Sequence, residues 1–342
     1  MPDMMRAVVL DAPGDPDALK IREVPRPVPR PGWVLVKVHA FGLNRSELHF
    51  RRGLGSSGSF PRIPGIEATG VVVETPGGEF DAGSQVAALM GGMGRTFDGG
   101  YAEYVTVPAS NVVPFTSHLD WAILGAVPEM LQTANGSLTV GVNAARGSSL
   151  LIRGGTSSIG MALVVLAKRR GITVLATTRN STKAQALLDA GADHAIIDTG
   201  SIAKEVREIF PDGVGGAVEL VGTPTLHDTL RATAVRGTVC FTGMLSDEWT
   251  VPDFYPIDYI PNGVRLTAYS GGAQDLPGAV LQEFLDAVAT GEVRVPIGKV
   301  YPFEDIVQAH QDMEDGSVTG KLVVTLDGQS DVPSGHSKER NS

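Results

Sequence analysis

Apolar strands and helical patterns alternate between residues 148 and 241, and this alternation constrains the fold more than any other feature of the sequence. Apolar segments such as TVLATT (173–178) and TVCF (238–241) are each preceded by a segment with helical periodicity. Parallel strands need crossover connections, which are usually helices, so this order predicts a parallel sheet with helices on both faces. We therefore expect an α/β fold with a doubly wound sheet.

The first strand of this region runs into the glycine-rich segment LLIRGGTSSIG (150–160). Gly154 and Gly155 permit close approach of a ligand to the backbone, Gly160 permits close packing, and a helix beginning near Ser158 directs free N–H groups at an anion. The segment departs from the common G-x-G-x-x-G pattern, because Ser157 stands where that pattern has glycine. It predicts a pyrophosphate cradle, although a tight strand-to-helix turn without a ligand would use the same residues.

The second strand indicates which dinucleotide the cradle would hold. An NAD site usually carries an acid about 20 residues after the glycines, to bind the ribose hydroxyls. Here Arg179 follows the strand, Lys183 is expected one helical turn after it, and no acid occurs before Asp189. Two cations four residues apart suit the 2′-phosphate of NADP, whereas the alternative is a solvated basic start of a helix.

The two ends of the chain differ from this central region. The first 110 residues or so are dense in Gly and Pro and contain short β-rich segments, which predicts a compact barrel-like β domain. The final segment returns to mixed patterns, so its strands are expected to rejoin the first domain. The predicted division is 1–122 with 265–327 in the β domain, 123–264 in the parallel-sheet domain, and a disordered tail at 328–342.

Composition narrows the possible functions. A chain of 342 residues with 42% hydrophobic content is long enough for two domains, and no apolar run reaches the roughly 18 residues of a membrane span. The net charge of −10 argues against a nucleic-acid surface. The start of the sequence lacks the pattern of a secretory signal, and the single cysteine, Cys240, excludes an intramolecular disulfide. We expect a cytoplasmic protein with no membrane or nucleic-acid partner.

Several phrases together resemble one protein family. They include GLNRSELHFRRG (42–53), PGIEATGVV, GGYAEYVTVP (99–108), LLIRGGTSSIG and TGKLVV (319–324). In this order and spacing the chain resembles the zinc-free quinone oxidoreductases, of the zeta-crystallin type, in the medium-chain dehydrogenase/reductase superfamily. The resemblance implies a Rossmann-type dinucleotide domain and a discontinuous, mainly β GroES-like domain.

The same resemblance allows a test for zinc. In the zinc alcohol dehydrogenases of the superfamily, the first phrase holds a cysteine ligand and the second a histidine ligand. Asn44 and Ile66 stand at these positions here, and neither offers the thiolate or imidazole that zinc prefers. A structural zinc held by four cysteines is impossible with Cys240 alone. We predict no metal, and therefore reduction of an acceptor by hydride from NADPH.

The resemblance also implies positions for the reacting groups. Asn44 and Thr133 are expected beside the nicotinamide and the acceptor, where they would orient rather than transfer protons. The alternatives are a turn residue for Asn44 and a helix residue bonded to its own backbone for Thr133. Glu47, Arg51 and Glu67 fall where the family carries charged residues near the cleft. They are expected to form an ion pair that fixes the loop, and proton transfer is the alternative.

The remaining predicted contacts belong to the cofactor. Loops at the carboxyl edge of an open α/β sheet bind ligands, which adds residues after the later strands. The full predicted set is Gly154, Gly155, Thr156, Ser157, Ser158, Ile159, Gly160, Thr178, Arg179, Lys183, Val221, Gly222, Thr242, Gly243, Met244, Ser270 and Lys321. One residue counts against NADPH: Asp198 stands where some relatives have a tyrosine beside the 2′-phosphate, and an acid there would repel it.

Three functions remain open on these residues. The first is an NADPH-dependent quinone reductase. The second is an enoyl or alkenal reductase, which would need an acid such as Tyr255, Tyr259 or Tyr269 to protonate carbon. The third is a nucleotide-binding protein without activity. We also expect a homodimer, paired through the segment TVCFTG as the exposed edge of the parallel sheet, or through the segment that follows it.

Overall fold

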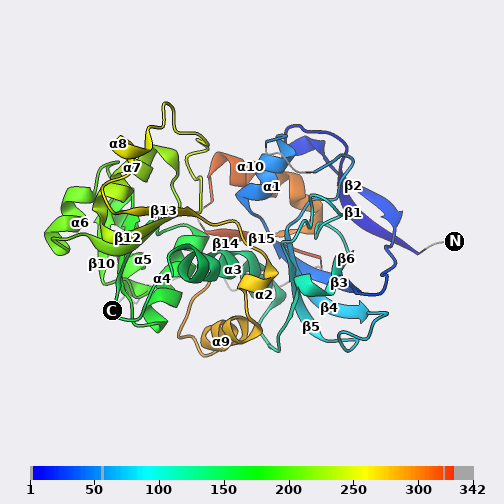
Figure 1. Cartoon of the computed structure of the whole chain (residues 1–342). Coiled ribbons are helices and arrows are strands. Elements are labelled where there is room, and N and C mark those ends of the chain that lie inside the picture. The colour runs from blue at the N-terminus through cyan, green and yellow to red at the C-terminus, as the bar shows by residue number, and fades with distance from the viewer. Residues whose placement is uncertain (1–2, 55–57, 319, 327–342) are drawn as a thin grey trace, which may run out of the picture.

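The computed structural model describes residues 3–54, 58–318 and 320–326. Two sheets form two bodies that lie side by side (Figure 1). The predicted tail, 328–342, lies outside the described residues. No helix within the described ranges is long and apolar enough to cross a membrane.

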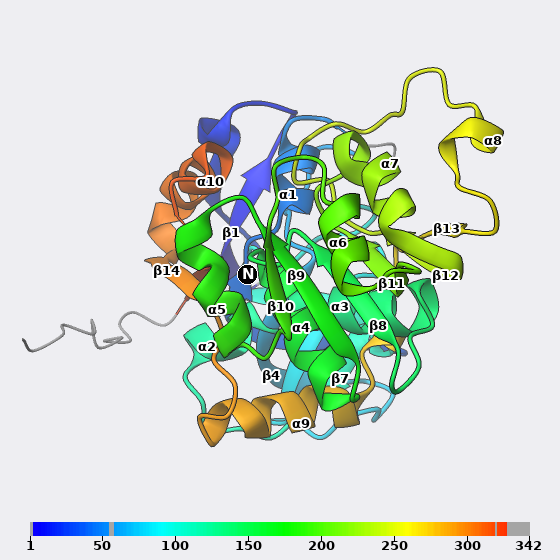
Figure 2. The same ribbon diagram turned by 90° about the vertical axis from the view of Figure 1, so that its left-hand side faces the viewer.

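The six-stranded sheet is entirely parallel, as the alternation predicted. Its strands are β8 (Ser149–Arg153), β9 (Thr173–Thr178), β10 (His194–Ile197), β11 (Val214–Glu219), β12 (Thr233–Phe241) and β13 (Arg265–Ala268). The helices between them are α4 (Ser158–Arg169), α5 (Ala184–Asp189), α6 (Ala203–Ile209) and α7 (Thr223–Ala232). Figure 2 shows helices on both faces of this sheet.

Both faces of the sheet are buried, and β8 shows why. Successive side chains of a strand point to opposite faces. Leu150 and Ile152 pack into one apolar core together with α4, whereas Leu151, between them, packs into a second core with α6 and α7. The near-continuous apolar composition of the strand follows from this double burial.

The strand order β10-β9-β8-β11-β12-β13 places a switch point between β8 and β11. The chain moves outward from β8 in one direction, then returns and moves outward in the other direction from β11. Ligands of open α/β sheets bind in the crevice outside the carboxyl ends of the strands at such a point. The fold therefore places the glycine-rich turn after β8 where a dinucleotide is expected.

The second body is mainly β, as predicted. A seven-stranded sheet has the order β14-β15-β3-β4-β5-β7, with β6 paired to β3, and a separate hairpin joins β1 and β2. The strands are β1 (Met4–Leu10), β2 (Leu19–Pro25), β3 (Trp33–Gly42), β4 (Glu67–Glu74), β5 (Gln85–Leu89), β6 (Tyr104–Pro108), β7 (Val112–Pro114), β14 (Ile297–Pro302) and β15 (Lys321–Thr325). Strand β15 pairs with β3, so the last strand lies in the same sheet as a strand of the first 110 residues.

The remaining helices connect the two bodies or cover them. They are α1 (Arg45–Arg51), α2 (Trp121–Ala126), α3 (Pro128–Gly136), α8 (Pro256–Tyr259), α9 (Gly278–Ala289) and α10 (Ile306–Asp315). One apolar core extends through both bodies, since it holds Ala40 of β3, Leu89 of β5, Leu131 of α3 and Ile152 of β8. Helix α3 thus lies between the two sheets, where it can present side chains to a site that both bodies share.

Strand β13 corrects one expectation. The segment TVCFTG is not the edge of the parallel sheet, because β12 pairs with β13 on its far side. The edge is β13, which the sequence analysis assigned to the other domain at the boundary 264/265. The segment between β12 and β13, which carries α8, projects from the body of the molecule (Figure 2).

Candidate active site

A cavity of about 660 Å³ lies between the two bodies and is lined by residues of both. Its walls come from α1 and β15 on one side, from α4 and the segment after β12 on the other, and from α3 between them. Ten of the predicted site residues line it: Asn44, Thr133, Ser157, Ser158, Ile159, Thr242, Gly243, Met244, Ser270 and Lys321. The structure therefore brings together residues that are almost 280 positions apart in the sequence.

The turn before α4 has the geometry of an anion site. Gly154 has a φ of +88°, which favours glycine, and a Cβ on Gly160 would lie 2.5 Å from the Gly154 carbonyl oxygen. Ser157 is the N-cap: its hydroxyl donates to the Gly154 carbonyl and accepts from the Gly160 amide. The φ of Ser157 is negative, so this position does not require glycine. This explains the departure from the glycine pattern.

The cap leaves two amides for a ligand. Within the described residues, the N–H groups of Ser158 and Ile159 donate to no protein acceptor, and both residues line the cavity. Free N–H groups and the positive end of the helix dipole both favour a phosphate. The start of α4 therefore fits the pyrophosphate of a dinucleotide.

The other predicted cofactor residues do not line this cavity: Gly154, Gly155, Thr156, Gly160, Thr178, Arg179, Lys183, Val221 and Gly222. The expectation that Lys183 lies one helical turn after Arg179 is wrong. Asn180 caps a short 3₁₀ helix, Ser181–Lys183, and Arg179 precedes this cap. Arg179 is exposed at the end of β9, and the side chain of Thr178 is bonded within the same turn.

The amides of Val221 and Gly222 already have an acceptor in the protein. Both donate to Oε1 of Glu219, at 2.8 and 3.1 Å, and the Thr225 hydroxyl donates to the same oxygen. Glu219 ends β11 and is completely buried. Burial raises the pKa of its carboxyl, while the hydrogen bonds act in the opposite direction. Glu219 shapes the turn that was expected to contact the cofactor.

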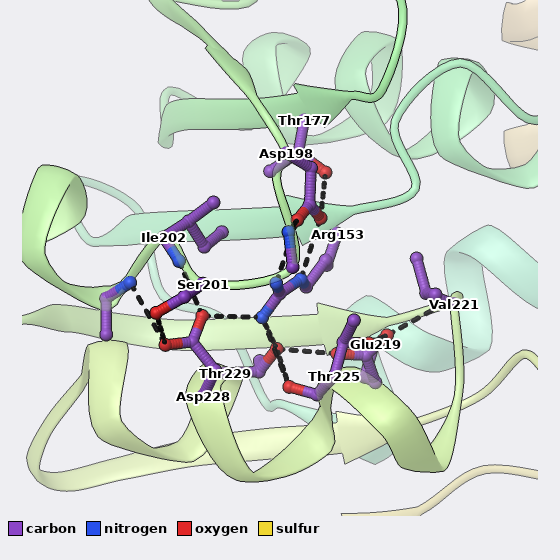
Figure 3. Close-up of polar contacts among 12 residues, drawn as sticks. Arg153, Thr177, Asp198, Ser201, Ile202, Glu219, Val221, Thr225, Asp228 and Thr229 are labelled. Atoms are coloured by element: carbon purple, nitrogen blue, oxygen red, sulfur yellow. Dashed lines mark hydrogen bonds and ion pairs between the residues drawn. The ribbon is translucent and has the colours of Figure 1, made fainter.

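Arg153 is the charged residue at the centre of this edge of the sheet (Figure 3). It ends β8 and is completely buried, and its guanidinium donates to both oxygens of Asp198, at 2.8 and 2.9 Å. It also donates to Asp228 at 2.8 Å and to the Thr229 hydroxyl at 3.1 Å. This role of Arg153 could not be predicted from the sequence, because one arginine at the end of an apolar strand gives no signal of a buried network.

The pairing with Arg153 changes how Asp198 would act on the 2′-phosphate of NADPH, which an acid at this position was expected to repel. Burial opposes its ionisation, but the hydrogen bonds and charge of Arg153 hold the pKa of Asp198 below its usual value. The charge is therefore paired inside the protein with Arg153 and with the Gly200 amide, which donates at 2.9 Å. A carboxylate compensated in this way repels a nearby phosphate less than an isolated one would.

A second buried network lies at the α3 end of the cavity. The Lys321 ammonium is 2.9 Å from Oε1 of Glu67 and 3.5 Å from Oε2 of Glu129, and it donates to the side-chain oxygen of Asn44. The Asn44 amide donates to Oε1 of Glu67 at 3.0 Å. Asn44 is the N-cap residue of α1, so the turn expected around it is the start of a helix. Lys321 therefore lies beside Asn44, and its ammonium pairs with the carboxyl groups of Glu67 and Glu129.

The expected ion pair among Glu47, Arg51 and Glu67 does not form. Glu67 pairs with Lys321, while Arg51 donates to Glu314 of α10, which lies beside α1 in Figure 1. Glu47 accepts from the amides of Asn44 and Ile66, at 3.0 and 2.9 Å. Burial raises the pKa of Glu47 to about 7, against the influence of Arg95 and of the Ile66 amide.

Thr133 bonds to side chains, not to its own backbone. Its hydroxyl lies 3.0 Å from Oε1 of Glu129 and 3.1 Å from Oε1 of Gln132. The Gln132 amide nitrogen donates to the Tyr269 hydroxyl at 2.7 Å, and this hydroxyl donates to Asp275 at 2.8 Å. Glu129 lines the cavity too, although nothing in its sequence context distinguishes it from other helix glutamates.

Only one of the three candidate tyrosines reaches the cavity. Tyr269 lines it, but burial and Asp275 raise the pKa of its hydroxyl, which already donates to that carboxylate. Tyr259 stacks on His227 with ring centroids 4.8 Å apart, and Tyr255 is 56% exposed. None of the three is placed to protonate a substrate.

A contact across the cavity links the two bodies. Arg45 and His49 of α1 contact Asp247, at 3.2 and 3.1 Å, and the His49 ring meets Trp249 edge-on at 4.7 Å. Arg45, His49 and Trp249 all line the cavity. Throughout the described ranges, no three His, Cys, Asp or Glu side chains are grouped as metal ligands.

Comparisons with known proteins follow the same division of the chain. The family model for the alcohol dehydrogenase GroES-like domain matches residues 30–117, and the model for zinc-binding dehydrogenase matches residues 190–324. These matches and the two sheets confirm the predicted fold class, a Rossmann-type parallel sheet with a GroES-like β domain.

Individual relatives cover almost the whole chain. The quinone oxidoreductase of Mus musculus is 27% identical over 341 residues, which cover 94% of this chain and 98% of the mouse protein. The solved structure of AibC is 30% identical, with a TM-score of 0.83, and the match covers 94% of this chain and 96% of AibC. A mycobacterial protein solved in complex with NADPH is 27% identical, with a TM-score of 0.80 and coverage of 94% and 99%. This chain therefore belongs to the quinone oxidoreductase family of the medium-chain dehydrogenase/reductases, a family of oxidoreductase enzymes.

Proposed function

We propose that this protein is an NADPH-dependent reductase of quinones or similar unsaturated carbonyl compounds. The observation that carries the proposal is the cavity itself, which joins the free amides at the start of α4 to the polar cluster of Asn44, Thr133 and Lys321. A dinucleotide with its pyrophosphate at α4 would extend its nicotinamide toward that cluster. The related quinone oxidoreductases and the NADPH-bound relative support this assignment.

Bound NADPH would supply the hydride, and the protein would place the acceptor and exclude water. Asn44 is held in position by Glu67 and Lys321, so its side chain is rigid. Leu43, Ile66, Met90 and Leu245 give the same cavity an apolar surface that suits a planar acceptor. These residues orient and enclose the acceptor without a covalent step.

We propose that the reaction needs no zinc. Asn44 and Ile66 lack the thiolate and imidazole that zinc prefers. The carboxylates beside Asn44, Glu67 and Glu129, already face a cation of the protein, the Lys321 ammonium. The donor set at this position therefore does not suit a divalent metal.

We further propose that NADPH is preferred over NADH. Arg179 directly follows β9, and Lys183 ends the short 3₁₀ helix after it. Asp198, the acid expected to repel the phosphate, is paired with Arg153. A 2′-phosphate gains charge-assisted hydrogen bonds from such cations. The backbone of Gly154, Gly155 and Thr156, together with Thr178, would line the adenosine side of the cofactor.

Two further proposals concern the oligomeric state of the protein and its location in the cell. The exposed strand β13 and the projecting segment before it, with Phe254, Tyr255 and Ile257 exposed, are the candidate surface of a homodimer. Light scattering at micromolar concentration tests this, and a monomer would contradict it. The buried single cysteine, Cys240, suits the reducing cytoplasm, which we propose as the location.

An acceptor panel tests the activity. NADPH oxidation is followed with 1,4-benzoquinone, with an enal and with an enone, using purified protein. Turnover with the quinone supports the proposal. Turnover with the enal or enone alone would reassign the enzyme as an alkenal or enoyl reductase. Cofactor binding without turnover on any acceptor would contradict enzymatic activity and leave a nucleotide-binding protein.

A further inference from the structure

The hydrogen bonds around Thr133 indicate where a proton is held. Oε1 of Glu129 and Oε1 of Gln132 both lie within hydrogen-bond distance of the Thr133 hydroxyl. The nitrogen of the Gln132 amide donates to Tyr269 and to the Gly272 carbonyl, so its oxygen must face Thr133. A hydroxyl has only one proton to donate. Both contacts are hydrogen bonds at the same time only if Glu129 is protonated and donates to Thr133.

The charges around Glu129 lead to the same result. Lys321 on β15 supplies one positive charge, while Glu67 on β4 and Glu129 on α3 supply two carboxylates, all three buried. Lys321 lies closer to Glu67, at 2.9 Å, so an ionised Glu129 would be a buried charge without full compensation. Burial raises the pKa of Glu129; Lys321 opposes this and Glu67 adds to it. Glu47 on α1, the next carboxylate in the cluster, also acts on Lys321.

The protonated carboxyl is connected to the cavity. Glu129 and Thr133 are four residues apart on α3, so they are neighbours on one face of the helix, and both line the cavity. Tyr269, the tyrosine that lines the cavity, donates its proton to Asp275 instead. Among the described residues considered as acids, the pair Glu129 and Thr133 is the one that lines the cavity with a carboxyl and a hydroxyl in contact.

We propose that Glu129 holds the proton for the reduction and delivers it to the acceptor through the Thr133 hydroxyl. This inference rests on the proposed reductase function. Hydride from NADPH, which is oxidised to NADP⁺, adds two electrons and leaves an anion on the acceptor. The Thr133 hydroxyl turns from Gln132 to that anion, and its O–H bond breaks as a new bond to hydrogen forms on the anion. Thr133 then takes the proton of Glu129. Glu129 is left as a carboxylate and regains a proton from water before the next turnover.

The substitution Glu129→Gln tests this step. A glutamine amide can donate to Thr133 as the protonated acid does, but it has no proton to transfer, so the fold and NADPH binding are retained. General acid catalysis contributes about 100-fold or more, and we expect kcat with benzoquinone to fall by about that factor. In the wild type, kcat falls as pH rises through the pKa of Glu129, and the variant loses this alkaline limb. The exposed residue Glu283 on α9 gives the matched control, Glu283→Gln.

An infrared measurement reads the protonation state without any turnover. In the cofactor-free protein at pH 7, the wild type should show the carbonyl band of a protonated carboxylic acid that is missing in Glu129→Gln and present in Glu283→Gln. Thr133→Val should lower kcat as strongly as Glu129→Gln while keeping this band, and Thr133→Ser should restore activity because it restores the hydroxyl.

The outcomes separate this inference from the proposed function. An unchanged infrared spectrum in Glu129→Gln, or a kcat and pH profile equal to those of the wild type, would overturn the proton path while the reductase function stands. A wild-type protein that reduces no acceptor would instead refute the proposed function, and the infrared band would then report only a buried acid.

Discussion

Arg153 shows how a single residue organises the carboxyl edge of the parallel sheet. Its guanidinium is completely buried, and it pairs with Asp198, in the connection between β10 and α6, and with Asp228 of α7 (Figure 3). A buried ion pair stabilises little in comparison with apolar packing, but the loss of one partner leaves an uncompensated charge inside the protein. The residue therefore fixes the loops that would surround the adenosine of the cofactor.

Replacing Arg153 with methionine should therefore be costly. Methionine fills much of the same volume, but it leaves Asp198 buried without its partner, and we expect the free energy of unfolding to fall by about 3–5 kcal/mol. Urea denaturation measures the loss. Arg22→Met, which removes an exposed pair with Asp11, is the control and should leave the free energy of unfolding close to that of the wild type. Equal losses in the two variants would contradict the account of the network.

Glu47 gives a second prediction, for pH dependence. Its pKa is about 7 in the folded protein and 4.5 in the unfolded chain, so the folded state binds a proton that the unfolded state releases between these values. The free energy of unfolding must then decrease as pH rises through this window, by about 1.4 kcal/mol per pH unit and roughly 3 kcal/mol in all.

Denaturation curves of the wild type and Glu47→Gln between pH 4.5 and 8 measure this term. The variant lacks the ionisation, so the stability difference between the two proteins should shift in favour of the variant as pH rises. Glu283→Gln should follow the wild type at each pH. Parallel curves for the wild type and Glu47→Gln would show that Glu47 ionises as freely as an exposed glutamate.

At the scale of elements, the start of α4 depends on a glycine that packs against backbone. A Cβ on Gly160 would lie 2.5 Å from the Gly154 carbonyl oxygen and 2.6 Å from that of Gly155, so the helix would have to move away from the turn. Overpacking of this kind costs about 1–3 kcal/mol. Gly160→Ala should therefore weaken NADPH binding by roughly 10-fold or more.

A glycine in a strand of the parallel sheet provides the control for that experiment. A Cβ on Gly215 of β11 would meet nothing closer than 3.5 Å, an ordinary van der Waals contact. Gly215→Ala should leave NADPH affinity, measured by fluorescence titration, at the wild-type value. Equal binding by Gly160→Ala would mean that the turn does not contact the cofactor.

The elements also show what the sequence can and cannot predict. The strands and helices from β8 to α7 were predictable because strands buried on both faces are continuously apolar and the helices between them are amphipathic. The polar clusters were not, because Arg153 and Glu129 have no periodic signal and acquire partners only when distant segments meet. The assumed helical turn between Arg179 and Lys183 failed because Asn180 caps a separate 3₁₀ helix.

At the scale of the whole molecule, the cavity exists because the chain returns to its first sheet. Strand β15 pairs with β3 and carries Lys321 to Glu67 and Asn44, which the first 70 residues supply. The sequence did not reveal which residues form the contact between the two bodies, because this contact depends on side chains.

The contacts of Asp247 join the two bodies beside the cavity, and they predict how much this junction contributes to ligand binding. Arg45 and His49 on one body reach Asp247 on the other, and such partly exposed pairs contribute about 0.2–1 kcal/mol. Asp247→Asn, which retains a residue that tolerates the positive φ of 59°, should raise KM for the cofactor or acceptor by about 2- to 5-fold with little change in kcat.

Steady-state kinetics measure the effect of Asp247→Asn. Asp11→Asn removes a charge from the exposed pair with Arg22, which lies outside the cavity lining, and should leave both constants unchanged. A large loss of kcat in Asp247→Asn, or a KM equal to that of the wild type, would contradict the role of this contact in joining the two bodies around the cavity.

The central claim is that the cavity between the two bodies binds NADPH, and a fluorescence titration of the wild type with NADPH and with NADH tests it most directly. We predict saturable binding of both, at least about 10-fold tighter for NADPH, with the preference lost in the double variant Arg179→Ala and Lys183→Ala. Failure of both nucleotides to bind would contradict the account, because the glycine-rich turn would then be only a connection between a strand and a helix.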